Sequence, residues 1–167
     1  MACVTLQGHV SRAIDFYNRG DIYFGIGRTT EWEDEKNPPI PTIESVVEEL
    51  IGFKRVESKY FVVPDADGEI TYKDARWAVV PAEEAISRGS RWVYLNCFIA
   101  FSELPTDISY RQIGVFSGIV PKNGYENTYV LYPDNISNSG VLELIDNRKP
   151  IYRSADLREQ LSIIIEF

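Results

Sequence analysis

The sequence predicts an α+β fold, mainly an antiparallel β-sheet or sandwich, with an N-terminal helix and one or more short helices. Three observations carry this prediction. A helical apolar pattern occupies residues 4–18, the later apolar runs are short and bounded by turn residues, and no helices alternate regularly with the strands. Consecutive strands without crossover helices pair antiparallel.

The size and composition favour a single ordered domain over residues 1–167. The chain has 167 residues, of which 44% are hydrophobic and 13% aromatic. That length fits one domain, and that apolar content excludes a disordered chain. We expect an N-terminal helix in residues 1–20, a strand with a proline-rich arm in residues 21–41, and a β-rich core in residues 42–167.

The N-terminal helix is predicted from a single apolar stripe. Apolar side chains recur at spacings of three and four, at Leu6, Val10, Ala13, Ile14 and Tyr17. This spacing places them on one face of a helix, and Gly20 is a suitable stop. The stripe must cover either the protein's own sheet or a neighbouring subunit.

The next segment combines a strand with a stiff extended piece. Residues 21–28 contain the run IYFGIG, in which Gly25 and Gly27 indicate a bulge or a close backbone approach. Asn37–Pro41 reads NPPIP, in which three prolines lack amide donors and have a fixed φ, so an extended, polyproline-like segment is predicted. Thr42 resembles a helix N-cap, so a second short amphipathic helix is expected from there to Leu50.

The rest of the chain is predicted to be mostly strand. A turn is expected at Pro64–Gly68 and a helical turn within Ala82–Arg88. Trp92–Phe101 is a continuous apolar run, as found in a central strand covered on both faces. The expected strands are Phe53–Val63, Ile70–Val80, Trp92–Phe101, Tyr110–Val120, Val141–Ile145 and Leu161–Phe167.

Charge and hydropathy disfavour nucleic-acid and membrane partners. The formal net charge is −8, and an acidic surface repels phosphate backbones. No run approaches the ~20 apolar residues of a membrane span, and the N-terminus lacks the pattern of a signal peptide. Cys3 and Cys97 are expected to be reduced thiols.

The sequence offers no convincing catalytic, cofactor or metal site. His9 is the only histidine. A metal site with several histidine ligands is therefore excluded, and a histidine-based catalytic triad would have to use His9. Gly25 and Gly27 lack the third glycine of a dinucleotide loop, and Asp65–Glu69 does not follow the calcium-loop spacing. We therefore expect no catalytic residue, no cofactor, no metal and no enzyme activity.

One segment resembles a known family. It comprises IYFGIGRTT at residues 22–30, then Trp32, Asp34-Glu35 and Asn37–Pro41. This order resembles a pattern in the baseplate wedge subunit of contractile-tailed phages, of the T4 gene-eight type. Weaker matches are Phe53–Val56 and Tyr110–Phe116 followed by Pro121. Since the T4-type subunit is considerably longer, the resemblance implies a shortened version.

The resemblance implies a non-enzymatic virion structural protein of the tail baseplate, made in the host cytoplasm. Its partners would be other tail or baseplate proteins, with self-association as a dimer or ring and without nucleic acid or membrane. A polyproline-like arm loses little entropy on docking, so it suits an assembly contact. The expected interface residues are Arg28, Trp32, Pro38, Pro39 and Pro41 in the arm and Val10, Ile14 and Tyr17 on the helix.

Two alternatives to a wedge subunit stay open at this point. The chain could be another tail or neck structural protein. It could also be a β-sandwich module that recognises carbohydrate or a receptor through exposed aromatic side chains such as Trp77, Trp92 and Tyr125. For the arm itself, the competing interpretation is a surface loop with Trp32 packed inward.

Overall fold

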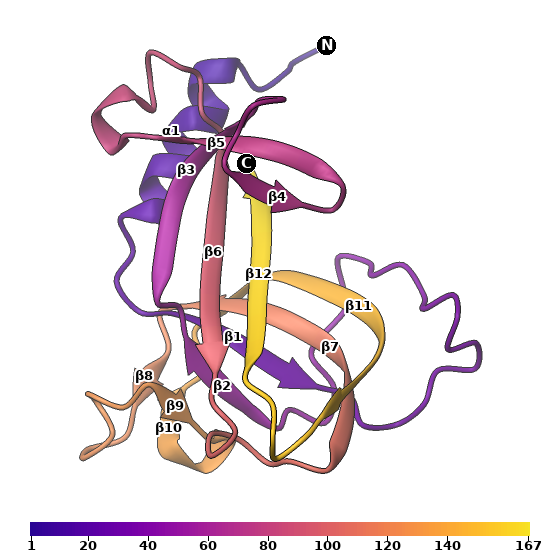
Figure 1. Cartoon of the computed structure of the whole chain (residues 1–167). Helices are drawn as coiled ribbons and strands as arrows, with labels where there is room; N and C mark the ends of the chain where they lie inside the picture. Colours follow the sequence, from indigo (N-terminus) through magenta and orange to yellow (C-terminus); the bar gives the residue numbers. More distant parts are fainter. The chain divides into compact units, whose positions relative to one another are not determined.

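The computed structural model describes residues 1–167 and confirms the α+β class (Figure 1). One α-helix precedes a set of strands, and every strand pair with an assigned register is antiparallel. The elements in chain order are α1 (Leu6–Tyr17), β1 (Ile22–Gly27), β2 (Gly52–Arg55), β3 (Ser58–Pro64), β4 (Ile70–Tyr72), β5 (Ala75–Val80), a 3-10 helix (Ala82–Glu84), β6 (Trp92–Ile99), β7 (Ile108–Ser117), β8 (Val120–Pro121), β9 (Val130–Leu131), a second 3-10 helix (Pro133–Asn135), β10 (Ile136–Asn138), β11 (Val141–Arg153) and β12 (Glu159–Glu166).

The residues form two compact units. Residues 1–19, 57–96 and 162–167 make up the first, and residues 20–56 and 97–161 make up the second. Strands β6 and β12 contribute residues to both. The single domain expected over residues 1–167 stays a prediction. Among the helices there is no candidate for a membrane span.

The first unit is built on a five-stranded sheet with the order β12-β6-β3-β5-β4. Burial alternates along β6: Val93 and Leu95 are buried, whereas Trp92 and Tyr94 are half-buried. The prediction that this strand is covered on both faces was therefore wrong. Large aromatic side chains such as Trp92 and Tyr94 occupy outward positions of the strand. They make the sequence look continuously apolar, although these side chains are only half-buried.

Helix α1 confirms the predicted N-terminal helix and packs beside β3 in Figure 1. Thr5 caps it, since its hydroxyl accepts a hydrogen bond from the Gly8 amide at 3.2 Å. The Tyr17 ring stacks on Phe61 with 4.2 Å between the ring centroids. Lys59 donates to the carbonyl oxygens of Tyr17 and Arg19, so it closes the C-terminal end of the helix.

The second unit contains a five-stranded sheet with the order β11-β7-β1-β2-β9. All six residues of β1 are buried, and this strand pairs with β7 on one side and β2 on the other. One core cluster of this unit comprises Tyr23, Phe53, Phe116, Ile119 and Leu131. The predicted strand at residues 21–28 is confirmed as β1, and the strand predicted at Tyr110–Val120 is confirmed as β7 as far as Ser117.

Four predicted elements differ in the structure. The strand expected at Val141–Ile145 continues to Arg153 as β11. The strand expected over Phe53–Val63 is split into β2 and β3, and Ile70–Val80 is the β4–β5 hairpin. The second helix, expected from Thr42 to Leu50, does not form; short turns occupy this stretch. An isolated helix of so few residues is marginal. From these turns Val47 and Leu50 pack against the core of the second unit, whereas Ile43 and Val46 stay exposed.

Gly27 is the position where a close backbone approach was predicted and is found. A Cβ at Gly27 would lie 2.4 Å from the backbone oxygen of Glu48. We expect Gly27→Ala to lower the free energy of unfolding by about 1–3 kcal/mol, since backbone must move to accept the methyl group. Gly20→Ala is the control, because nothing lies within 4 Å of its Cβ position. Equal urea midpoints for the two variants would contradict the steric account.

Candidate assembly interface

A long loop between two neighbouring strands is the most distinctive surface feature of the second unit. Residues 28–51, the arm loop, connect β1 to β2, although these strands pair directly from Ile26 opposite Gly52. Antiparallel neighbours need only about 2–5 residues to turn. In Figure 1 the arm loop extends away from the sheet. Long loops of this kind are usually functional.

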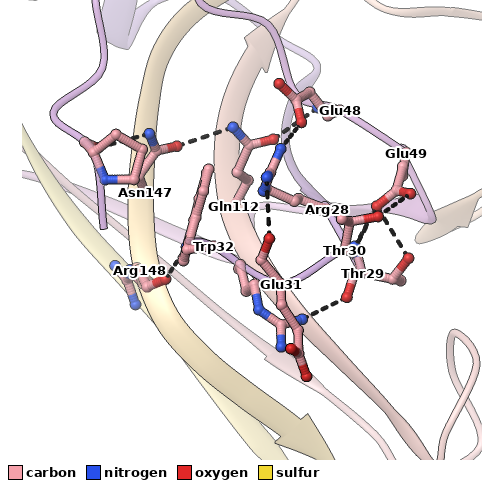
Figure 2. Close-up of polar contacts among 12 residues, drawn as sticks. Arg28, Thr29, Thr30, Glu31, Trp32, Glu48, Glu49, Gln112, Asn147 and Arg148 are labelled. Atoms are coloured by element: carbon pink, nitrogen blue, oxygen red, sulfur yellow. Dashed lines mark hydrogen bonds and ion pairs between the residues drawn. The ribbon is translucent and has the colours of Figure 1, made fainter. Parts of the chain in front are cut away.

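The base of the arm loop is fastened by one carboxylate. Figure 2 shows Glu49 accepting hydrogen bonds from the backbone amides of Thr29 and Thr30 at 2.7 and 2.8 Å and from both hydroxyls at 3.0 and 2.7 Å. Arg28 and Glu49 themselves have φ angles of 54° and 45°. Such left-handed backbone costs about 1–2 kcal/mol per residue, so these contacts hold a strained turn in place.

Contacts of Arg28 and Trp32 also hold the base of the arm loop in place. The Arg28 guanidinium lies 3.8 Å from the Trp32 ring centroid, pairs with Glu48 and donates to the Glu31 carbonyl. Trp32 is only 9% exposed, and its indole N–H donates to the Arg148 carbonyl oxygen at 2.9 Å (Figure 2). The structure therefore has Trp32 packed inward against its own chain. Any role that it has at an interface is indirect.

Strand β7 holds the arm loop through two polar residues. Buried Arg111 donates to both carboxylate oxygens of Glu35, and the Gln112 side chain accepts from the Glu48 amide at 2.7 Å. These hydrogen bonds from Arg111 hold the pKa of Glu35 below its usual value. The Asn147 side chain donates to the Pro39 carbonyl oxygen at 2.9 Å. The arm loop is thus bound to β7 and β11 at Glu35, Pro39 and Glu48.

These contacts join the segments that carried the family resemblance. The motif at residues 22–41 contains Glu35, and the weaker match at Tyr110–Phe116 contains its partner Arg111. The third match, Phe53–Val56, lies in and directly after β2, which pairs with β1. Segments far apart in the sequence therefore build one structure, namely a sheet and the loop fastened to it.

The hydrogen bonds of the Glu49 carboxylate predict that the stability of the fold depends on pH. Hydrogen bonds from the Thr30 amide and hydroxyl, followed by those from Thr29, lower the pKa of Glu49 to about 2. A lowered folded-state pKa stabilises the fold fully above the unfolded pKa of about 4.3 and progressively less as the pH falls towards 2. We expect Glu49→Gln to reduce stability at pH 7 and to match wild type near pH 2. Chemical denaturation between pH 2 and 7 measures this, and a constant difference would contradict it.

The tip of the arm loop, residues 38–46, exposes large apolar side chains. Ile40 is 90% exposed, Ile43 is 103% exposed and Val46 is 63% exposed. Pro39 is exposed as well, whereas Pro38 and Pro41 are partly buried. The sequence analysis missed Ile40, Ile43 and Val46 as contact residues. The apolar spacing in this stretch was attributed to a helix, but the structure leaves these side chains without a covering surface.

The other predicted interface residues, Val10, Ile14 and Tyr17, lie on helix α1. Val10 is 3% exposed, Ile14 is partly buried, and Tyr17 is engaged with Phe61. Beside them lies a hollow of about 290 Å³, the helix groove. Its lining residues are Leu6, Gln7, Val10, Ser11, Ile14 and Ile86. Leu6 and Ile86 are 55% and 68% exposed, so the rim of this groove is apolar.

Two of the three aromatic residues named for the carbohydrate-binding alternative pack against each other. Trp77 and Trp92 pack edge to face, with 5.8 Å between ring centroids, and both are half-buried. Tyr125 is 40% exposed and belongs to the second unit. The structure thus uses Trp77 and Trp92 to cover each other on the first unit's sheet.

Known proteins similar to this chain are phage structural proteins. A family described as baseplate wedge 3 tail fiber network component matches residues 1–167. "Virion protein 3" of Enterococcus phage phiEF24C is 29% identical over 176 residues, which cover 99% of this chain and 96% of that protein. The baseplate-wedge resemblance inferred from the sequence is thereby confirmed, and the similarity extends beyond the motif to the whole chain.

Proposed function

This chain belongs to the baseplate wedge 3 tail fiber network component family, and we propose that it works without catalysis by holding neighbouring subunits in a fixed geometry. It is a structural virion protein of a phage baseplate and interacts with other tail proteins. Within the baseplate, its place would be the wedge, and its neighbours would include the tail fiber network named by the family.

The observation that carries this proposal is a fastened loop with an exposed apolar tip. Contacts through Glu49, Trp32 and Arg111 hold the base, so the tip is presented with little freedom to lose on docking. Ile40 and Ile43 are almost wholly exposed, and exposed apolar patches commonly mark interaction sites. The tip is therefore the proposed contact, whereas Arg28 and Trp32 position it from within.

Particle assembly tests the proposal. A double variant, Ile40→Ser with Ile43→Ser, is expected to keep the wild-type thermal midpoint, since both side chains are exposed. In phage whose own gene is inactivated, complementation with this variant should lower the copies per purified particle more than tenfold, as counted by mass spectrometry. Leu157→Ser removes another exposed apolar side chain, 66% exposed, and is the matched control. Incorporation of the double variant at the Leu157→Ser level would refute the proposal.

A further inference from the structure

We propose that Gln112 and Asn147 are positioning residues that hold the arm-loop tip in one place on the sheet. The proposal rests on the assembly function above, in which the tip carries the contact through Ile40 and Ile43. It assigns the two residues that decide where this contact is presented. Neither of them needs to touch a partner protein, because both act through the backbone of the arm loop.

Two side-chain amides form a chain of hydrogen bonds between distant parts of the arm loop. The Glu48 amide donates to Gln112 Oε1 at 2.7 Å, and Gln112 Nε2 donates to Asn147 Oδ1 at 2.9 Å. Asn147 Nδ2 then donates to the Pro39 carbonyl oxygen at 2.9 Å. Figure 2 shows Gln112 between Glu48 and Asn147. The chain thus connects Pro39, in the tip, with Glu48, close to the other end of the loop.

The sheet sets the two amides beside each other. Gln112 of β7 and Asn147 of β11 are partners in the strand register. Gln112 is only 3% exposed, so a lost hydrogen bond at its amide would leave a buried polar group unpaired. Directly after Asn147 the register shifts, because the next pair is Tyr110 with Ile151, two residues along β7 but four along β11. Such bulges re-aim nearby side chains, which supports the orientation of Asn147 towards the arm loop.

The chain of hydrogen bonds has a fixed direction, and a side-chain amide at both positions fits it. The backbone N–H of Glu48 can only donate, and the carbonyl oxygen of Pro39 can only accept. Each side chain between them must therefore accept on one side and donate on the other, as asparagine and glutamine do. An ionised carboxylate only accepts and a lysine only donates, so neither of these can replace Gln112 or Asn147.

Asn147 provides the hydrogen bond that ties the tip to the sheet. The other hydrogen bonds of residues 38–46 stay within the tip, between Thr42, Glu44 and Ser45. The prolines fix φ, so holding Pro39 also restricts the residues next to it. Without the bond from Asn147, the tip should move while the base of the arm loop stays closed.

Distances between two spin labels on the full chain test the proposal. One label is placed at Glu44→Cys in the tip and the other at Val141→Cys in β11, both exposed positions, in a Cys3→Ser background that leaves only the buried Cys97. This parent chain should give one narrow distance distribution at pH 7. In Asn147→Asp the carboxylate cannot donate to the Pro39 carbonyl oxygen, so the distribution should be at least about twofold wider. Circular dichroism checks that each variant folds.

Acid should restore the missing hydrogen bond in this variant. An aspartate carboxyl group has an ordinary pKa of about 3.9, so at pH 3 the introduced group is mostly protonated. It can then donate to the Pro39 carbonyl oxygen and still accept from Gln112. Asn147→Asp should therefore regain the parent width at pH 3, whereas Asn147→Ala should stay wide at both pH values. The parent chain at pH 3 is the control for the carboxylates of the arm loop itself.

A matched charge control is Asn127→Asp, at an exposed position of the same unit. It should keep the narrow distribution at pH 7. In the complementation experiment described above, Asn147→Asp should enter particles at least about threefold less than Asn127→Asp, as expected for the loss of one hydrogen bond. A general weakening of the fold would not be reversed by acid, so the pH readout separates positioning from stability.

Three results overturn the inference. They are a narrow distribution for Asn147→Asp at pH 7, a distribution that stays wide at pH 3, and incorporation of Asn147→Asp at the level of Asn127→Asp. The proposed function survives each of them if the variant Ile40→Ser with Ile43→Ser is still excluded from particles. If that double variant is incorporated like its control, the proposed function fails, and the positioning role fails with it.

Discussion

Replacing Glu159 with leucine is expected to lower the free energy of unfolding by about 3–5 kcal/mol, because it leaves a buried arginine without its ion pair. Arg153 is 2% exposed and donates to Glu159 at 2.7 Å, as well as to the Glu103 carbonyl oxygen at 2.7 Å. Tyr110 also donates to Glu159, and burial raises the pKa of this phenol, which keeps it protonated. Urea unfolding followed by fluorescence measures the loss.

The matched control lies on the same strand. Glu166 pairs with Arg91 at 2.8 Å, and the two side chains are 57% and 34% exposed. An exposed pair contributes less than about 1 kcal/mol, so Glu166→Leu should change the unfolding midpoint little. If both leucine variants lose the same free energy of unfolding, the burial of Arg153 does not account for the effect of Glu159→Leu.

Trp32→Ala is expected to have the second largest effect, a loss of about 3 kcal/mol, because it removes a nearly buried ring together with its stacking on Arg28. The Arg148 carbonyl oxygen also loses its donor. The base of the arm loop should then open, and amide hydrogen exchange in residues 28–49 should accelerate. Denaturant unfolding and exchange mass spectrometry together measure both effects.

Trp32→Phe separates the ring from the hydrogen bond. Phenylalanine keeps much of the packing but cannot donate to Arg148, so a loss of only about 1 kcal/mol is expected. An alanine variant whose arm loop exchanges at the wild-type rate would show that Trp32 is not what holds the loop closed.

Local pattern was enough to predict several elements of the fold. Helix α1 follows from an apolar stripe that one sheet face covers, and β1 and β7 follow from runs whose side chains are buried. In these three elements the spacing of apolar residues in the sequence corresponds to the side chains that the structure buries. The close approach predicted at the glycines is found at Gly27, where the Glu48 backbone leaves no room for a side chain.

Predictions from sequence pattern were wrong where the structure of a segment depends on what packs against each of its faces. In β6, the half-buried aromatic side chains of Trp92 and Tyr94 looked like core residues, although burial alternates along the strand. From Thr42 to Leu50, the apolar spacing matched a helix, but only Val47 and Leu50 pack against the core, whereas Ile43 and Val46 stay exposed. A short helix with so little covering does not form. Glu48 and Glu49 instead bind Arg28, Thr29 and Thr30.

By itself, the sequence determined the α+β class, the N-terminal helix and the membership suggested by the motif at residues 22–41, since each depends on residue order within a short window. Only the tertiary structure decided what the motif does. Contacts across long sequence separations, from Trp32 to Arg148 and from Glu35 to Arg111, turn Trp32 inward and leave Ile40 and Ile43 exposed. No local pattern encodes which side chains find a partner and which stay open to solvent, because that depends on what the rest of the fold brings beside them.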